Sequence, residues 1–256
     1  MKINYLCNSW QYLLQQVVYM VGRGYYNYHV GTIPTDKVAK ANKIDKKIIE
    51  KYKIDLSKDQ RARRKKKKLA NFYYLRWENQ FIILYTDGQL DVTLDDTFYD
   101  VRLKQKEVNK LKIKVSEYME FNVVMQNKKD NKGKRSVTVC MSNDSYKELR
   151  ANIDDIISHR QIKRLEQLFK NLRGLPAWQG VIKQEYKLLE EVYKDAKKYG
   201  LNTKKKNLIK YPKQYPNLDL YPLRINTFRK TYSHSYYSTN TSFEKATDTV
   251  PVATKT

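Results

Sequence analysis

The chain has 256 residues and a large excess of positive charge. Its 51 Lys and Arg against 27 Asp and Glu give a formal charge of +24, and charge on that scale opposes compaction unless a polyanion relieves it. A hydrophobic fraction of 41% is ordinary for a folded protein, which excludes wholesale disorder. The length suits one large domain with an appendage, and nucleic acid is the leading class of partner.

The positive charge is interrupted once. Residues 1–86 carry 18 Lys and Arg against 6 Asp and Glu, net +12, and residues 102–256 carry net +17. Residues 87–101 contain five Asp and no base. An acidic segment inside a basic chain requires a physical explanation, either chemistry or pairing with the surrounding cations.

Two features bear on the compartment. Cys7 and Cys140 stand far apart without neighbouring Cys or His ligands, so neither a zinc knuckle nor a disulfide framework is expected. Two free thiols fit a reducing, cytoplasmic location. Residues 5–21 are apolar in places, but five polar residues interrupt them, which predicts a buried helix and neither an export signal nor a membrane span.

The first half of the chain alternates helical and extended patterns. Apolar residues at spacings of three and four predict a helix in 5–21, and the Tyr-rich segment 25–33 predicts a strand that Pro34 ends. Residues 36–56 have helical periodicity. A second helix is expected over 57–70, with Ser57 as its N-cap and Asn71 at its end.

Extended patterns follow. Residues 72–88 predict two strands joined at residues 78 and 79, and further strands are expected in 97–103, 111–126 and 135–141. The turn-forming residues of 127–134 separate the last two. This order predicts an α+β fold with a mixed or antiparallel sheet, in a domain spanning residues 1–141.

The second half predicts a helical hairpin over residues 142–200. The segment 142–144 is a natural N-cap, one long helix or two should follow, and Pro176 precedes the last helix. Beyond it, Tyr-Pro pairs interleaved with bases predict an extended strap over 201–229. The Ser/Thr-rich remainder, 230–256, predicts a disordered tail.

The segment "RARRKKKK" at 61–68 is the first candidate site. Seven of its eight residues are charged, and on a helix they would present cations to phosphate with salt-dependent affinity. A solvated helix face is the alternative explanation. The residues expected to contact nucleic acid here and on the following strand are Arg61, Arg63, Arg64, Lys65, Lys67, Lys68 and Arg76.

The aromatic strands are the second candidate. Alternate residues of a strand point to opposite faces, so Tyr26, Tyr28 and Tyr74 include rings that would lie away from the core if the sheet is covered on one side only. Such rings would stack on unpaired bases, which suits single-stranded DNA or RNA. Core packing is the alternative for each of them.

The acidic segment is the third candidate. Asp87, Asp91 and Asp95 would hold Mg²⁺ if they converge, and otherwise would pair with nearby bases. No other cofactor is expected. Three His, no Gly-rich phosphate loop and no metal-binding His pair argue against familiar nicking enzymes and nucleotide hydrolases.

The running order of segments resembles a group of uncharacterised basic bacterial proteins associated with plasmids and mobile elements. The likeness lies in the aromatic strand "GYYNYHVGTIP", the Arg-rich helix and the helical segment containing "LRGLPAWQG", and spans about residues 10–200. The resemblance implies a setting in replication, maintenance or transposition, and it implies no activity or site residue.

The leading hypothesis is therefore a non-enzymatic nucleic-acid-binding protein, with DNA favoured over RNA. Two alternatives stay open: a nicking or strand-transfer enzyme that uses a Tyr nucleophile or Mg²⁺, and an RNA-scaffold protein. No membrane partner is expected, and oligomeric state is open. Replacing Arg61, Arg63 and Arg64 together by Ala is expected to flatten the salt dependence of binding and leave thermal stability nearly unchanged.

Overall fold

A computed structural model describes residues 5–127, 135–172, 174–176 and 178–199. The chain divides into two units, Met1–Leu223 and Arg224–Thr256, and every described residue belongs to the first. The predicted strap at 201–229 and tail at 230–256 lie outside the described residues, as does the predicted loop from residue 128 to 134.

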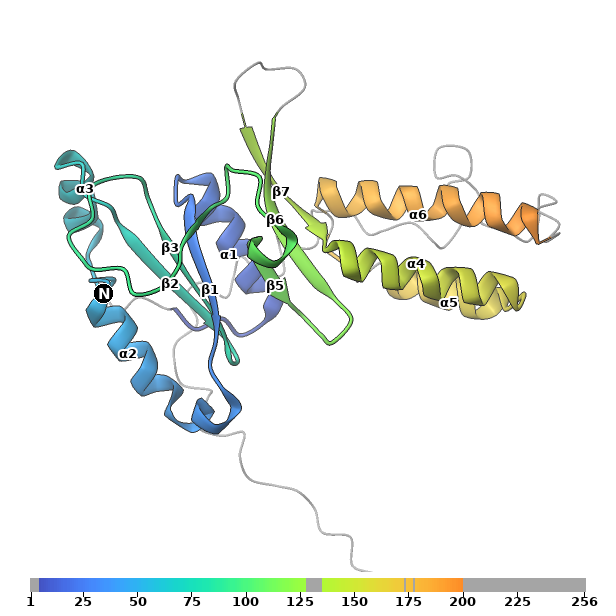
Figure 1. The fold of residues 1–256 in the computed structure, drawn as a ribbon, viewed down its shortest axis with the longest axis horizontal. Helices are drawn as coiled ribbons and strands as arrows, with labels where there is room; N and C mark the ends of the chain where they lie inside the picture. Colours follow the sequence, from blue (N-terminus) through green and yellow to red (C-terminus); the bar gives the residue numbers. More distant parts are fainter. Residues whose placement is uncertain (1–4, 128–134, 173, 177, 200–256) are drawn as a thin grey trace, which may run out of the picture. The chain divides into compact units, whose positions relative to one another are not determined.

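The first sheet has four antiparallel strands in the order β2-β3-β1-β4 (Figure 1). Their bounds are Asn27–Thr32 for β1, Phe72–Trp77 for β2, Gln80–Tyr85 for β3 and Tyr99–Asp100 for β4. The β2–β3 hairpin turns at residues 78 and 79, as predicted, with Trp77 opposite Gln80. The last predicted strand, 97–103, is reduced to a two-residue pairing with β1.

The second sheet has three antiparallel strands in the order β5-β6-β7: Lys112–Lys114, Glu120–Asn127 and Arg135–Met141. The predicted strand at 111–126 is therefore two strands. The chain reverses between them, where the Val115 N–H donates to the Met119 carbonyl at 2.8 Å. Helices and antiparallel sheets together confirm the predicted α+β class.

Four helical segments precede β2: α1 at Trp10–Gly22, η1 at Thr35–Lys40, α2 at Ala41–Lys51 and α3 at Lys58–Lys66. Ser9 caps α1 by accepting from the Tyr12 N–H. The helix predicted from residue 36 begins instead with the 3-10 segment η1, and no residue of η1 is buried. Regular α-helix starts at Ala41, which is the first buried residue of this helical region.

Three helices follow β7: α4 at Asn143–Ser158, α5 at Ile162–Leu172 and α6 at Gln179–Lys198. Ser142 caps α4, as expected, by accepting from the Ser145 N–H. The sequence pattern of residues 142–172 is compatible with one long helix or with two. The structure has two, α4 and α5, because the chain turns at Arg160, whose φ is 54°. Arg150 joins α4 to α6 through Glu191 at 2.8 Å and Asp195 at 2.6 Å.

One hydrophobic cluster connects α1, both sheets and the three later helices. Trp10 of α1 stacks on Phe121 of β6 with ring centroids 5.6 Å apart. At the start of α6, Gly180 lies directly on β7: a Cβ atom there would stand 2.3 Å from the Val139 carbonyl oxygen. Glycine therefore sets how closely α6 approaches the second sheet.

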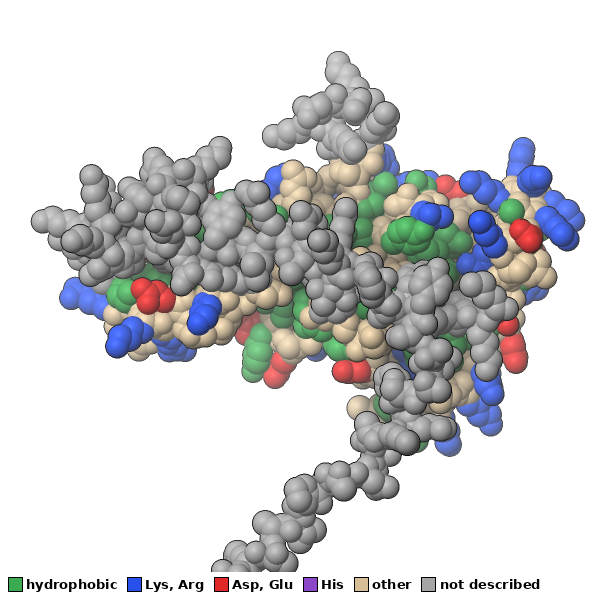
Figure 2. Space-filling view, turned by 180° about the vertical axis from the view of Figure 1, so that it is seen from behind, with side chains coloured by type: hydrophobic (Ala, Val, Ile, Leu, Met, Phe, Trp, Pro, Cys, Tyr) green, Lys and Arg blue, Asp and Glu red, His purple; other side chains and the backbone are tan. Residues whose placement is uncertain are grey.

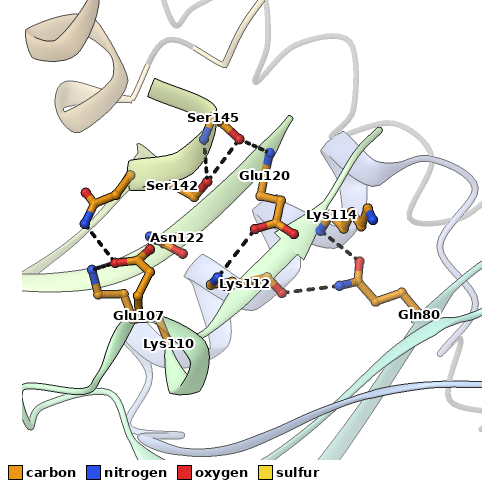
Figure 3. A network of polar contacts seen from close by, with 10 residues as sticks. Gln80, Glu107, Lys110, Lys112, Lys114, Glu120, Asn122, Ser142 and Ser145 are labelled. Carbon is orange, nitrogen blue, oxygen red and sulfur yellow. Dashed lines mark hydrogen bonds and ion pairs between the residues drawn. The ribbon is translucent and has the colours of Figure 1, made fainter. Parts of the chain in front are cut away.

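A polar network ties the second sheet to its neighbours (Figure 3). Glu107, in the 3-10 segment η2 (Glu107–Asn109), accepts from Lys110 Nζ at 2.5 Å and from the side-chain amides of Asn122 and Asn143, both at 3.0 Å. The Gln80 side chain of β3 spans to Lys112 and Lys114 of β5. These contacts satisfy polar groups at the junction of the two sheets.

A second cluster covers the opposite face of the first sheet. Its buried members are Tyr52, Ile54, Ala70, Phe72, Tyr74 and Ile83, and its partly buried members include Val92, Leu94 and Phe98. Along β2, Tyr73 and Leu75 belong to the first cluster, whereas Phe72 and Tyr74 belong to the second. The first sheet is therefore covered on both faces, so the condition under which rings of its strands would lie away from the core is not met.

Candidate nucleic-acid interface

The basic helix α3 begins where the sequence predicts and ends earlier. Ser57 and Gln60 form a capping box: the Gln60 N–H donates to Ser57 Oγ at 3.2 Å and the Ser57 N–H to Gln60 Oε1 at 2.7 Å. The helix stops at Lys66, because Lys68 adopts a positive φ of 58° and Ala70 pairs with Gln89. Lys67 and Lys68 therefore lie on a turn.

Two Arg of α3 face inward and stabilise the fold. Arg61 donates to the Ile54 carbonyl at 3.1 Å, and its guanidinium lies 5.5 Å from the Tyr73 ring centroid. Arg64 donates to the Ala70 carbonyl at 2.7 Å and forms a two-point ion pair with Asp91, at 2.8 and 2.6 Å. Both side chains are half-buried. These contacts hold both guanidinium groups within the protein, which leaves them poorly placed for phosphate.

The remaining cations of α3 and its turn point to solvent. Within the part of the chain that the structure describes, none of them forms an ion pair with a carboxylate. Lys and Arg side chains gather at the right edge of Figure 2, the end of the molecule that carries α3 in Figure 1. We call the following set the α3 basic face: Lys58, Arg63, Lys65, Lys66, Lys67 and Lys68.

Every Asp of the acidic segment has a partner. Asp91 accepts from Arg64 and from Lys53, the latter at 3.1 Å, and the hydrogen bonds from Arg64 hold the pKa of Asp91 below its usual range.

The other four Asp of the segment are paired in the same region. Asp95 accepts from Lys51 at 2.5 Å and Asp96 accepts from the Tyr52 hydroxyl at 2.7 Å. Asp87 and Asp100 share Arg102, at 2.7 and 2.6 Å. Pairing with nearby cations therefore accounts for four of these carboxylates, and a tyrosine hydroxyl accounts for Asp96.

The predicted Mg²⁺ site does not form from Asp87, Asp91 and Asp95. Each of the three pairs with a different cation, and they do not converge. Among the described residues, no group of three or more His, Cys, Asp or Glu is arranged to hold a metal ion. The physical reason is local: Arg64, Lys53, Lys51 and Arg102 reach these carboxylates and neutralise them.

The predicted stacking surface is also corrected. Tyr28 is 2% exposed and donates to the Asn109 carbonyl at 2.5 Å, and Tyr74 is fully buried and donates to Asp45 at 2.6 Å. Tyr26 is half-buried, with the Arg102 guanidinium 4.4 Å from its ring centroid. Tyr28 and Tyr74 are therefore not free to receive a base, and Arg102 lies over the ring of the half-buried Tyr26.

Arg76 is likewise part of the core. Its Nε donates to both carboxylate oxygens of Asp45 at 3.0 Å, and its Nη1 donates to the Glu78 carbonyl at 2.6 Å. Asp45 is completely buried. The predicted role of Arg76 in nucleic-acid contact does not fit this environment, since its hydrogen bonds serve to attach α2 to β2.

Sequence reasoning missed two features near this site. Asp45 is the first acidic residue of the Lys-rich helix α2, and its position among the inward-facing Ile residues was a signal of burial. It also missed a second set of exposed cations, on η1 and α2. The periodic separation of Lys from Ile in residues 40–51 was the signal for that set.

Comparison with known proteins finds no matching family model, no similar curated protein and no similar solved structure. In the described part of the chain, no helix combines the length and apolar character needed to cross a membrane.

Proposed function

We propose that the protein binds nucleic acid by placing the α3 basic face against phosphates. The observation that carries the proposal is a separation of charge: the inward cations have carboxylate or carbonyl partners, whereas the six outward cations have no described carboxylate partner. Holding like charges together on one surface is unfavourable unless a polyanion approaches it. DNA is the favoured polyanion.

A solvated helix face is the competing explanation for these cations. Solvated faces usually mix charges of both signs, as α4 does with Lys147, Glu148 and Asp155 all exposed. Helix α3 contains one acidic residue, Asp59, among its Lys and Arg. The near absence of acid on this helix favours binding over simple solvation.

The proposal extends to the setting and the location of this binding. Replication, maintenance or transposition of a mobile element follows from the resemblance in segment order, as does the preference for DNA. A cytoplasmic location is proposed because Cys7 and Cys140 are free thiols. No observation in the described chain favours nicking or strand transfer. An RNA-scaffold role would use the same phosphate chemistry, and the experiment below separates it.

The test is a binding titration against labelled DNA and RNA across a range of salt. Each phosphate contact should contribute a slope of about −0.9 in log Kobs against log salt for a duplex. The variant R63A/K66A/K67A should reduce the slope by the equivalent of up to three phosphate contacts. The three side chains that it removes are exposed and form no ion pair within the part of the chain that the structure describes.

The matched control is K147A/K163A/K170A, which removes the same charge from exposed positions on α4 and α5. It should bind like the unmodified protein. A wild-type slope near zero, or equal losses in the two variants, would rule out the α3 basic face as the binding surface. Tighter, salt-dependent binding to RNA would favour the RNA-scaffold alternative.

A further inference from the structure

A second row of cations lies on the two segments before α3. Lys37 and Lys40 of η1, and Lys43, Lys46 and Lys47 of α2, are all exposed. In the described chain none of the five forms an ion pair. They recur at spacings of three and four, so those of α2 share one side of the helix.

The core fixes which side of α2 faces outward. Asp45 points inward, where Tyr74 and Arg76 of β2 donate to it at 2.6 and 3.0 Å. Ile48 and Ile49 pack against the second hydrophobic cluster on the same side. Rotating α2 would expose this pairing and bury lysines, so the outward position of Lys43, Lys46 and Lys47 is a built feature of the fold.

The acidic segment holds α2 and α3 together. Asp91 accepts from Lys53, just beyond α2, and from Arg64 in α3. Asp95 binds Lys51 at the end of α2, and Arg61 of α3 donates to the Ile54 carbonyl between the helices. The cations of η1 and α2 and the α3 basic face are therefore attached to one another and to the same sheet, and Figure 1 draws α2 and α3 at the same edge of the molecule.

This combined surface offers cations without aromatic rings. The large hydrophobic side chains that are exposed elsewhere include Tyr19 in α1, Tyr118 between β5 and β6, and Tyr199 after α6. On η1, α2 and α3 the described chain exposes Val38 and no aromatic residue. Unpaired bases would find no stacking platform here, whereas phosphates would find cations along both elements.

We infer that η1–α2 and the α3 basic face form one surface for the phosphate backbone of a nucleic-acid duplex, bound independently of base sequence. This inference rests on the proposed function and extends it to a second element and a class of ligand. A duplex carries a higher charge density than a single strand and releases more counterions per contact, so a surface of cations alone binds it more tightly.

The experiment compares three proteins: K43A/K46A/K47A in α2, R63A/K66A/K67A in α3, and their combination. Each is titrated with a labelled DNA duplex, the matching single strand and an RNA duplex. The α2 variant should lose roughly tenfold in duplex affinity at physiological salt and should flatten the slope by up to three contacts. The combined variant should lose duplex affinity by about the product of the two fold-changes, because both surfaces contact one ligand and their binding free energies add.

The outcomes separate the inference from the proposed function. If the α3 variant weakens binding and the α2 variant matches the K147A/K163A/K170A control, the second element is refuted and the proposed function stands. A single strand that binds more tightly than the duplex would overturn the assignment of the ligand. A wild-type slope near zero would remove both. A Tm no lower than that of the wild type confirms that the exposed substitutions leave the fold of each variant intact.

Discussion

Glu185 of α6 is a carboxylic acid buried in the core. The side chain is 5% exposed, and its Oε2 atom has no hydrogen-bond partner among the described residues. Desolvation raises the pKa of Glu185 to about 8, from an ordinary value of 4.5. The folded protein therefore keeps this group protonated at a pH where the unfolded chain has lost the proton.

A pH dependence of stability follows from that difference. Between the unfolded and folded pKa values the folded state holds the extra proton, so the free energy of unfolding falls as pH rises through this window and levels off above about pH 8. Glu185→Gln removes the titration. We expect it to stabilise the protein by on the order of 2–4 kcal/mol at about pH 9, with little effect at about pH 5.

Urea denaturation of the wild type and of Glu185→Gln at the two pH values measures this. Glu148→Gln provides the control, since Glu148 is exposed on α4 and should not alter the pH dependence. Equal stability of Glu185→Gln and wild type at the higher pH would show that the buried carboxyl finds a partner when ionised.

Arg63 and Arg64 show how far sequence reasoning extends at single residues. The sequence predicts a basic helix capped by Ser57, and the structure confirms it. It does not predict that Arg64 turns toward Asp91, because that contact joins residues 27 positions apart. Replacing Arg61, Arg63 and Arg64 together would therefore also damage the fold, contrary to the expectation from sequence. Only Arg63 of the three is exposed.

At the scale of elements, local patterns were sufficient where the contact is local. Ser142 and the hairpin of β2 and β3 were predicted correctly from nearby residues. The double coverage of β2 was missed because its second face is covered by Val92, Leu94 and Phe98, which come from a distant loop. The continuous run of aromatic and apolar residues from Phe72 to Leu75 was the available signal in the sequence, since strands covered on both faces lack alternation.

Asp91 connects α3 to the segment that follows α2. Its replacement by Asn is expected to weaken duplex binding although it makes the protein more positive. Asp91→Asn raises the net positive charge, which alone would strengthen binding to a polyanion. Because Asp91 fixes Arg64 and Lys53 relative to each other, we expect instead that duplex binding weakens about three- to tenfold, or roughly 0.6–1.4 kcal/mol. Asp59→Asn makes the same charge change at an exposed position of α3 and should strengthen binding slightly.

The two variants are compared in one duplex titration, with thermal unfolding measured in parallel. Lys53→Ala breaks only the side of the contact nearer α2 and should also weaken binding, with a smaller loss of stability. If Asp91→Asn remains folded and binds more tightly than wild type, Asp91 acts only as a competing anion, and the positioning role is refuted.

At the scale of the whole molecule, long-range repulsion and short-range pairing respond differently to salt. The formal charge of +24 produces repulsion over many ångströms, which the Debye length limits to about 30 Å at 0.01 M salt and about 8 Å at 0.15 M. The ion pairs of the acidic segment have N···O distances of 3.1 Å or less, which is shorter than either Debye length, so salt weakens them much less than it weakens the long-range repulsion.

Screening of the repulsion should therefore dominate the response of stability to salt, and Tm should rise as sodium chloride increases over this range. R63A/K66A/K67A, which removes three exposed cations, should show a smaller rise than wild type. Sodium sulfate at equal ionic strength separates screening from anion binding: screening gives equal shifts in the two salts, whereas bound sulfate gives a larger shift that R63A/K66A/K67A should reduce. A fall in Tm with sodium chloride would mean that short-range pairs carry more stability than the excess charge removes.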